Sequence, residues 1–193
     1  MVVLDGKKIS NDIKNEIALE VKSMTAKGNR PPHLAAIIVG NDGASLTYVG
    51  SKVRACERVG FDSSLISLSE SINENELLDK VNQLNNDDNI DGYIVQLPLP
   101  KHIDSQKILM SVDPEKDVDG FHPTNFGRMA LNLPTFISAT PYGIMELLKR
   151  YDVQTEGKHT VVIGRSDIVG KPISLLMGLK TNPGNSTVTM VHS

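Results

Sequence analysis

The segment that most restricts the fold is a continuous apolar run, Leu-Ala-Ala-Ile-Ile-Val at residues 34–39, which closes on Gly-Asn-Asp-Gly at residues 40–43. A strand exposed on one face alternates apolar and polar residues, whereas an uninterrupted apolar run is typical of a strand covered on both faces. The segment therefore predicts a buried strand in an α/β fold, and a loop directly after it.

Helical and extended patterns alternate along the rest of the N-terminal part. Apolar residues recur three and four positions apart, as at Ile13, Ile17 and Val21, where the sequence predicts an amphipathic helix. Together with the first strand, these segments predict a three-layer α/β lobe over residues 1–139. Helices are predicted at residues 9–24, 43–60, 74–84 and 105–110, and further strands at residues 64–68 and 91–97.

A second lobe is predicted over residues 140–193. Thr140 as N-cap and Pro141 at the first helical position start a linking helix, whose apolar side is assigned to Ile144, Leu147 and Leu148. A strand at residues 160–163, a turn into a helix at residues 164–172 and a strand at residues 187–191 then form one βαβ unit. That unit is the first part of a Rossmann-type dinucleotide domain. An apolar strand that ends at the last residue predicts a truncated chain.

Composition excludes several classes of protein. With 193 residues the chain can bury a sizeable core, and 20 basic against 23 acidic side chains predict no extended surface for nucleic acid. A single cysteine and five scattered histidines supply neither an internal disulfide nor a metal site, which favours a reducing compartment. No apolar segment is long enough for a membrane span, so we expect a soluble, cytoplasmic protein without bound metal.

The first candidate functional pair lies on the helix that follows the buried strand. Tyr48 and Lys52 are four residues apart on one helical face, and Val49, Val53 and Cys56 share an adjoining apolar face. A lysine held beside a phenol on a packed helix loses freedom and hydration, which prepares its amine for proton transfer. The same spacing also fits a surface helix with two extended side chains.

Two further segments add polar side chains. Gln96 stands where the third strand runs into Pro98 and Pro100, and ligands of open parallel sheets bind outside the carboxyl ends of the strands. We therefore expect Gln96 and the helix at residues 43–60, which carries Lys52, to face one crevice outside the carboxyl ends of the strands. Residues 113–123 form an acidic loop in which apolar residues interleave with the carboxylates, and this predicts a packed loop with Asp117 or Asp119 turned inward.

The turn after the strand at residues 160–163 is a candidate anion site. Strand, glycine turn and helix start together aim backbone N–H groups at whatever lies over the turn, and a pyrophosphate suits such a place. The spacing from Gly164 through Ser166 to Gly170 differs from the G-x-G-x-x-G fingerprint, so an ordinary tight turn also fits. Ile168 occupies the last position of a G-x-S-x-G elbow, which argues against a serine hydrolase.

The end of the last strand indicates the type of dinucleotide. NAD-binding proteins usually place an acidic residue there, on the ribose hydroxyls, whereas this chain reads Val191-His192-Ser193. With no carboxylate there and Arg165 in the turn, a 2′-phosphate is acceptable, so NADP is favoured over NAD. Arg165 can equally be a residue of the helix surface.

Four separated blocks span essentially the whole chain: Tyr48-Val49-x-x-Lys52, Gln96-Leu97-Pro98-Leu99-Pro100, Asp117-Val118-Asp119-Gly120-Phe121-His122-Pro123 and Gly164-Arg165-Ser166-x-Ile168-Val169-Gly170-x-Pro172. They occur together in one family, and the sequence closely resembles the bifunctional methylenetetrahydrofolate dehydrogenase/methenyltetrahydrofolate cyclohydrolase family. Two departures stand out: Ser138-Ala139 replaces the family's common Pro-Cys before Thr140-Pro141, and family members run on for roughly another hundred residues.

The resemblance implies a role for each candidate. Lys52 is the catalytic lysine, Tyr48 orders its amine and the water, and Gln96 binds the lysine or the folate. Asp119 holds the pterin, whose adjacent N–H and amino groups suit a bidentate carboxylate. The implied catalytic residues are Lys52, Tyr48, Gln96 and Asp119; the substrate-binding residues are Tyr48, Gln96, Pro98 and Asp119; the cofactor-binding residues are Thr140, Gly164, Arg165, Ser166, Val169, Gly170, Pro172 and Ser193.

The resemblance also implies an activity. The family oxidises 5,10-methylenetetrahydrofolate to 5,10-methenyltetrahydrofolate with NADP and hydrolyses this to 10-formyltetrahydrofolate, in the one-carbon metabolism that serves purine biosynthesis, and we expect a homodimer. Two alternatives stay open: a folate-binding fragment without turnover, and a generic NAD(P)-dependent oxidoreductase. The acidic loop argues against the second, because a bare Rossmann reductase does not need it.

Overall fold

β1 (His33–Val39) is the central strand of a three-stranded parallel sheet in the order β2-β1-β3, with β2 (Asp62–Leu68) and β3 (Gly92–Val95) on either side. The computed structural model describes residues 3–193, the side chain of Ala44 excepted. All five residues from Ala35 to Val39 are buried, which confirms the predicted strand covered on both faces. The fold class is α/β, as expected.

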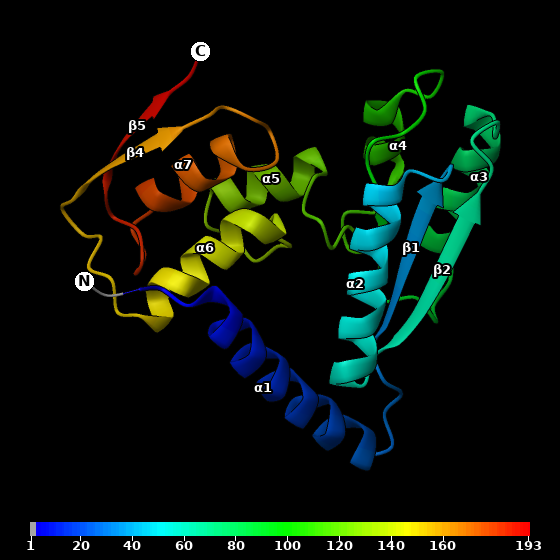
Figure 1. Cartoon of the computed structure of the whole chain (residues 1–193), viewed down its shortest axis with the longest axis horizontal. Coiled ribbons are helices and arrows are strands. Elements are labelled where there is room, and N and C mark those ends of the chain that lie inside the picture. Colours follow the sequence, from blue (N-terminus) through cyan, green and yellow to red (C-terminus); the bar gives the residue numbers. More distant parts are fainter. Residues whose placement is uncertain (1–2) are drawn as a thin grey trace. The chain divides into compact units, whose positions relative to one another are not determined.

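The chain divides into two compact units. The N-terminal unit covers residues 10–118, and the C-terminal unit covers residues 119–193 together with residues up to 9. Every helix and strand predicted within the N-terminal unit is confirmed (Figure 1). Its helices are α1 (Gly6–Ala26), which crosses into the other unit, α2 (Gly43–Val59), α3 (Glu74–Asn85) and α4 (Ser105–Ser111).

Helices cover the two faces of the first sheet. The side chains of Ala36 and Ile38 point to one face, where they form a cluster with Val49 of α2. Ala35 and Ile37 point to the opposite face, in a larger cluster that includes residues of α3 and α4. Figure 1 shows α2 lying along one side of β1 and β2. The predicted three-layer arrangement is therefore confirmed for this unit.

Local polar contacts fix where the helices begin and end. Asn73 starts α3 with a capping box: its Oδ1 accepts from the N–H of Glu76 at 2.9 Å, and the Glu76 carboxylate accepts from the N–H of Asn73 at 3.2 Å. α2 ends at Gly60, whose φ of 83° is a left-handed conformation that glycine adopts without strain. These contacts set the start of α3 and the end of α2.

The C-terminal unit contains a second, two-stranded parallel sheet. β4 (His159–Ile163) and β5 (Thr187–Val191) pair along their full length and are joined by α7 (Gly170–Gly178). This is the predicted βαβ unit. α7 packs on one face, where Val162 and Val188 contact a core cluster. On the other face Val161 is 53% exposed and Ile163 is 87% exposed.

A helix that we did not predict precedes the linking helix. α5 (Pro123–Ala130) starts at a proline, and the Nδ1 of His122 accepts a hydrogen bond from the N–H of Thr124 at 3.1 Å. Proline at the first helical position is the sequence signal that could have revealed it. Its Met129 lies in the core cluster of the unit.

The start of the linking helix α6 (Ala139–Arg150) corrects two predictions. Ser138, not Thr140, holds the N-cap position, and Thr140 lies exposed in the first turn. The Ser138 hydroxyl donates to the carbonyl of Ile168 at 2.8 Å instead of capping the helix. Pro141 and Met145 form the buried side, whereas Ile144, assigned to that side, is 37% exposed.

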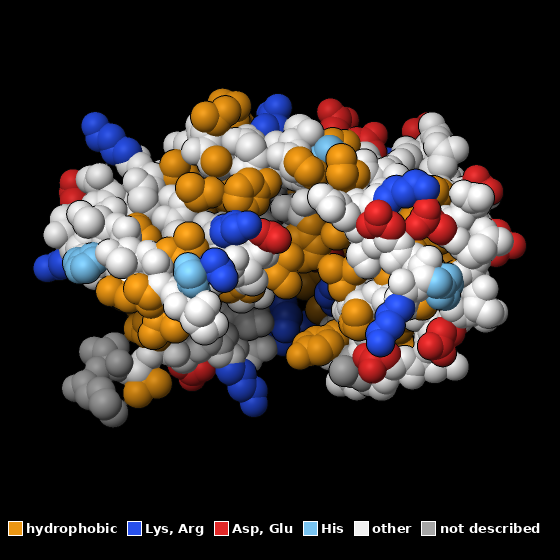
Figure 2. Space-filling view, turned by 90° about the horizontal axis from the view of Figure 1, so that it is seen from above, with side chains coloured by type: hydrophobic (Ala, Val, Ile, Leu, Met, Phe, Trp, Pro, Cys, Tyr) orange, Lys and Arg blue, Asp and Glu red, His pale blue; other side chains and the backbone are white. Residues whose placement is uncertain are grey.

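The surface carries both signs of charge. On the face shown in Figure 2, acidic and basic side chains lie next to one another, in line with 20 basic and 23 acidic residues in the whole chain. Within residues 3–193, no helix combines the length and the apolar character that crossing a membrane requires.

Candidate active site

The lysine helix begins at a double cap. The carboxylate of Asp42 accepts from both the N–H and the hydroxyl of Ser45, each at 2.8 Å, and Ser45 is buried. Such a cap satisfies a backbone donor that the helix itself leaves unpaired. Tyr48 and Lys52 follow one and two turns later, so this contact sets their position. We did not single out Ser45, although an Asp three residues before a serine at a helix start is a recognisable signal.

One side of α2 is fixed by packing. Val49 is 1% exposed and Cys56 is 5% exposed, and Val53 packs against the cluster beneath them. Burial raises the pKa of the Cys56 thiol, so it stays a neutral, apolar filler. The predicted anchoring face is therefore confirmed. On the adjoining face Tyr48 is 65% exposed and Lys52 is half-buried.

Gln96 lies directly after the carboxyl end of β3. Its N–H donates to the carbonyl of Ile37 at 2.9 Å, which continues the pairing of β3 with β1. Its side-chain Nε2 donates to the carbonyl of Leu97 at 2.7 Å, and the residue is half-buried. Because β1 and β3 are parallel, their carboxyl ends lie at the same edge of the sheet. Gln96 and the loop into α2 therefore follow neighbouring strand ends.

The acidic loop is packed, as predicted. Asp117 is 5% exposed and forms a parallel bridge with Tyr93 of β3. Asp119 is half-buried and begins the segment 119–193 of the C-terminal unit. Gly120 has a φ of 67°, and a Cβ there would lie 2.7 Å from the backbone nitrogen of Ser138, so only glycine fits. Pro98 is exposed beyond the end of β3.

The turn between β4 and α7 is a close approach of two backbone segments. The N–H of Gly164 donates to the carbonyl of Val191 at 2.8 Å, which extends the pairing of β4 with β5. A Cβ on Gly170 would lie 2.6 Å from the carbonyl oxygen of Gly164. Glycine at residue 170 is therefore a requirement of the turn itself, whether or not a phosphate binds there.

A serine already caps the start of α7. The hydroxyl of Ser166 accepts from the N–H groups of Val169 at 3.2 Å and Gly170 at 3.1 Å. The prediction that unoccupied N–H groups point over the turn is therefore wrong for these two amides, because a hydroxyl of the turn takes the place of an anion. Arg165 and Ser166 are nevertheless exposed, so the turn still presents polar side chains.

The remaining predicted cofactor residues differ in exposure. Pro172 is fully buried in the unit, Val169 is half-buried, and Ser193 is exposed at the end of β5. Arg165 extends an Nη1 to within 3.4 Å of the Nε2 of His192. A cationic side chain thus lies beside the end of β5, where the sequence has no carboxylate. Among the described residues, no group of three His, Cys, Asp or Glu side chains is arranged to hold a metal ion.

Known proteins match both units. Residues 4–119 match the catalytic domain of the tetrahydrofolate dehydrogenase/cyclohydrolase family, and residues 138–193 match its NAD(P)-binding domain. The bifunctional protein FolD of Flavobacterium johnsoniae is 71% identical over 193 residues, which is 100% of this chain and 65% of that protein. The chain thus spans about two thirds of the length of the curated relatives it matches.

Solved structures agree with the sequence comparison. The crystal structure of the bifunctional enzyme FolD, a methylenetetrahydrofolate dehydrogenase/cyclohydrolase from Campylobacter jejuni, superposes with a TM-score of 0.94 at 46% identity, covering 100% of this chain and 67% of that chain. The Trypanosoma brucei FolD structure, complexed with NADP cofactor and inhibitor, has a TM-score of 0.91 at 35% identity and covers 99% and 64%. On these matches, the chain belongs to the tetrahydrofolate dehydrogenase/cyclohydrolase family.

Proposed function

We propose that this protein oxidises 5,10-methylenetetrahydrofolate to 5,10-methenyltetrahydrofolate with NADP and hydrolyses the product to 10-formyltetrahydrofolate. The observation that carries the proposal is the half-buried Lys52, four residues after Tyr48 on a helix whose other side is anchored in the core. The C. jejuni relative, a bifunctional methylenetetrahydrofolate dehydrogenase/cyclohydrolase, supports both activities. The Lys52 amine is the proton-transfer group.

The chemistry explains why a lysine serves here. Oxidation turns the methylene bridge of the folate into a methenyl cation, which a permanently charged ammonium would repel. In the proposed step, the Lys52 amine takes a proton from the water that attacks this cation. Tyr48 orders the amine and the water, and α2 holds both side chains at a fixed spacing. Water addition then opens the methenyl bridge and leaves a formyl group.

Asp119 and Gln96 supply the binding contacts. The Asp119 carboxylate pairs with the adjacent ring N–H and amino group of the pterin, a bidentate geometry that gives both affinity and orientation. Gln96 offers an amide to Lys52 or to the folate from the carboxyl end of β3. Pro98 follows it and contributes an apolar surface for the substrate.

The residues of the C-terminal unit fit NADP. When bound, NADP accepts the hydride from the methylene carbon. Gly164 and Gly170 keep the turn narrow enough for close approach, and the cationic Arg165 at the end of β5 suits a 2′-phosphate. Thr140, Ser166, Val169, Pro172 and Ser193 complete the proposed cofactor set. The NADP complex of the T. brucei relative supports NADP as the cofactor.

Further properties belong to the same proposal. We place the functional boundary between the folate lobe and the cofactor lobe at residues 139 and 140. The protein acts as a homodimer in the cytoplasm, in the one-carbon metabolism that serves purine biosynthesis. No nucleic acid takes part, because the near balance of acidic and basic residues provides no extended basic surface.

An absorbance assay tests the proposed activity. The chain is mixed with 5,10-methylenetetrahydrofolate and either NADP or NAD, and formation of the reduced nicotinamide and of the methenyl product is followed. We expect turnover with NADP to exceed turnover with NAD. Binding of tetrahydrofolate without any turnover would identify a folate-binding fragment instead. Turnover only with unrelated substrates would identify a generic oxidoreductase.

A further inference from the structure

The segment between α4 and Asp119 has almost no secondary structure of its own. Its one parallel bridge joins Asp117 to Tyr93, and the N–H of Tyr93 donates to the carbonyl of Lys116 at 2.9 Å. This bridge decides which residue of the segment lies beside which residue of β3. Val118 and Asp119 follow the bridged residue Asp117 in a turn, so a shift of the bridge by one residue would put a different residue beside Tyr93 and displace Asp119 with it. The direction of the Asp119 carboxylate therefore depends on this register.

Asn85, the last residue of α3, holds the register by three hydrogen bonds. Its Oδ1 accepts from the phenol of Tyr93 at 2.6 Å and from the N–H of Asp113 at 2.8 Å. Its Nδ2 donates to the carbonyl of Ser111 at 2.8 Å. Burial, helped by the nearby Asp113 and Asp117, raises the pKa of the Tyr93 phenol, which keeps it a neutral donor. One amide thus joins α3, the end of α4, β3 and the segment.

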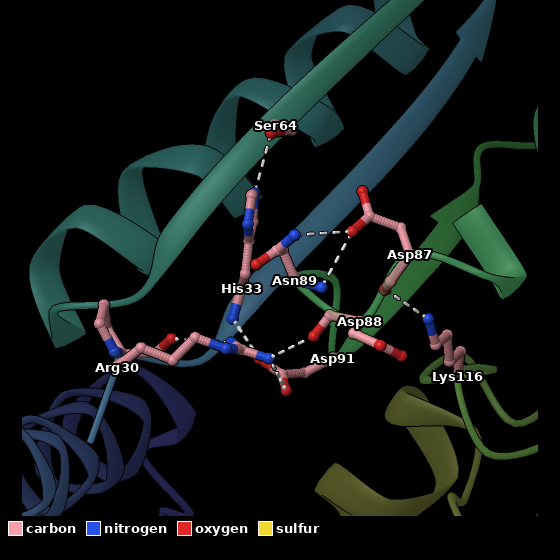
Figure 3. Close-up of polar contacts among 9 residues, drawn as sticks. Arg30, His33, Ser64, Asp87, Asp88, Asn89, Asp91 and Lys116 are labelled. Atoms are coloured by element: carbon pink, nitrogen blue, oxygen red, sulfur yellow. Dashed lines mark hydrogen bonds and ion pairs between the residues drawn. The ribbon is translucent and has the colours of Figure 1, made fainter. Parts of the chain in front are cut away.

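Lys116 adds a second attachment at the same helix end. Its Nζ donates to the carbonyls of Leu84 at 2.9 Å and Asp87 at 2.7 Å, two oxygens at the carboxyl end of α3. Figure 3 shows the ammonium group of Lys116 directed at the backbone of Asp87. Cations are favoured at this end of a helix, because the carbonyls there lack helical partners. The segment is therefore attached to the end of α3 twice, through the side chain of Asn85 and through the side chain of Lys116.

Val118 packs between β3 and α2, the helix that carries Lys52. A Cβ on Gly92 would lie 2.2 Å from the Cγ1 of Val118, so the missing side chain of Gly92 is the space that Val118 fills. Val118 packs against the same cluster as Val49 and Val53 of α2. The residue before Asp119 is thus seated against the helix that carries Lys52.

We propose that Asn85 is a positioning residue for folate binding: through Tyr93 and Asp113 it sets the register of residues 113–118 and thereby aims the carboxylate of Asp119. This inference rests on the proposed function, because it takes Asp119 as the group that binds the pterin. Asn85 itself touches no substrate. When its bonds are lost, only a fraction of molecules holds the competent register, and the apparent affinity falls by that fraction.

The test is the affinity of the 193-residue chain for tetrahydrofolate, measured by calorimetry. We expect Asn85→Leu to weaken binding roughly tenfold, and Tyr93→Phe, which removes one of the three bonds, to weaken it a few fold. Hydrogen exchange of the amides at residues 113–119 should become faster in both variants. If Asn85→Leu fails to fold, Tyr93→Phe decides the question.

The control is Arg30→Met. Arg30 binds the Asp91 carboxylate at 2.6 and 2.8 Å and the carbonyl of Asp88 at 2.9 Å, in the same unit (Figure 3). This variant should lower the melting temperature and leave tetrahydrofolate affinity unchanged. Unchanged affinity in the folded test variants, or an equal loss in the control, would overturn the role of Asn85. Failure of the unsubstituted chain to bind tetrahydrofolate would instead refute the proposed function, and the role of Asn85 with it.

Discussion

The two sheets of this protein differ in how they are covered. The sheet of β2, β1 and β3 has helices on both faces, and Ile37 at its centre is 0% exposed. The pair β4 and β5 has α7 on one face, and Ile163 on the other is 87% exposed. β1 and β4 both contain runs of valine and isoleucine. Isoleucine therefore contributes to the core at Ile37 in one unit and lies in solvent at Ile163 in the other.

The candidate sites of the two units also differ in what they require of side chains. In the N-terminal unit, the proposed chemistry depends on side chains, and buried neighbours such as Val49 and Ser45 lie on the same helix as Tyr48 and Lys52. In the C-terminal unit, the turn at Gly164 and Gly170 depends on the absence of side chains. Substitutions that remove a functional group should therefore affect the first site, and substitutions that add atoms should affect the second.

The largest effect is expected from Lys52→Met. This change keeps the length of the side chain and removes the amine, so hydrolysis of methenyltetrahydrofolate should fall about a thousandfold, a general-base contribution within the usual range. The decay of methenyl absorbance measures it. Lys22→Met, an exposed position on α1, is the matched control. A Lys52→Met chain that hydrolyses as fast as the control would show that the proton-transfer group lies elsewhere.

The contrast between the sheets is tested by one substitution in each. Ile37→Ala removes a fully buried side chain and should lower the free energy of unfolding by about 2–5 kcal/mol. Ile163→Ala removes an exposed one and should change it by less than about 0.5 kcal/mol. Urea unfolding of both variants gives the comparison. Similar losses would show that the outer face of β4 is covered in solution.

Local patterns predicted most of the fold, and tertiary contacts explain the rest. Every strand was predicted, because a continuous apolar run, as at residues 34–39, or an alternation of apolar and polar residues, as at residues 187–191, identifies a strand without knowledge of its neighbours. The burial of Met145 in place of Ile144 was missed, because the face that α6 buries is set by its packing against residues of α7 such as Ile173 and Leu176, which come much later in the chain.

In the candidate site, too, the sequence pointed to the residues with local signals and missed those defined by distant contacts. Tyr48, Lys52 and Gln96 were identified from helical spacing and a strand end, both of which are local signals. Asn85 was not, because its partners Tyr93 and Asp113 are 8 and 28 residues away and an asparagine at a helix end has no distinctive pattern. The capping of Val169 and Gly170 by Ser166 was also missed, since the sequence shows a polar turn but not the direction of the hydroxyl.

An added methyl group should destabilise the turn between β4 and α7 more than it destabilises the middle of α5. Gly170→Ala places a Cβ against the carbonyl of Gly164 and should cost about 1–3 kcal/mol of unfolding free energy, with loss of NADP binding. Gly127→Ala, in α5 with nothing within 4 Å, should be neutral or stabilise by up to about 1 kcal/mol. Thermal melting and NADP titration measure both. A Gly170→Ala chain as stable as Gly127→Ala would contradict the close approach.

The smallest effect is expected at the opposite edge of the first sheet, where Asp91 binds Arg30 and the N–H of His33. The hydrogen bond from Arg30 holds the pKa of Asp91 below its usual range. A lowered folded pKa stabilises the protein above the pKa of the unfolded chain, and this contribution disappears as the pH falls through the folded value. The stability difference between the unsubstituted chain and Asp91→Asn should therefore be full near pH 6 and shrink below about pH 4. Asp88→Asn, which removes the same charge three residues away, should show no such trend, and chemical unfolding at several pH values measures both. Because the pair is largely exposed, a pH-independent difference would mean that hydrogen-bond geometry, rather than charge, is what Asp91 contributes.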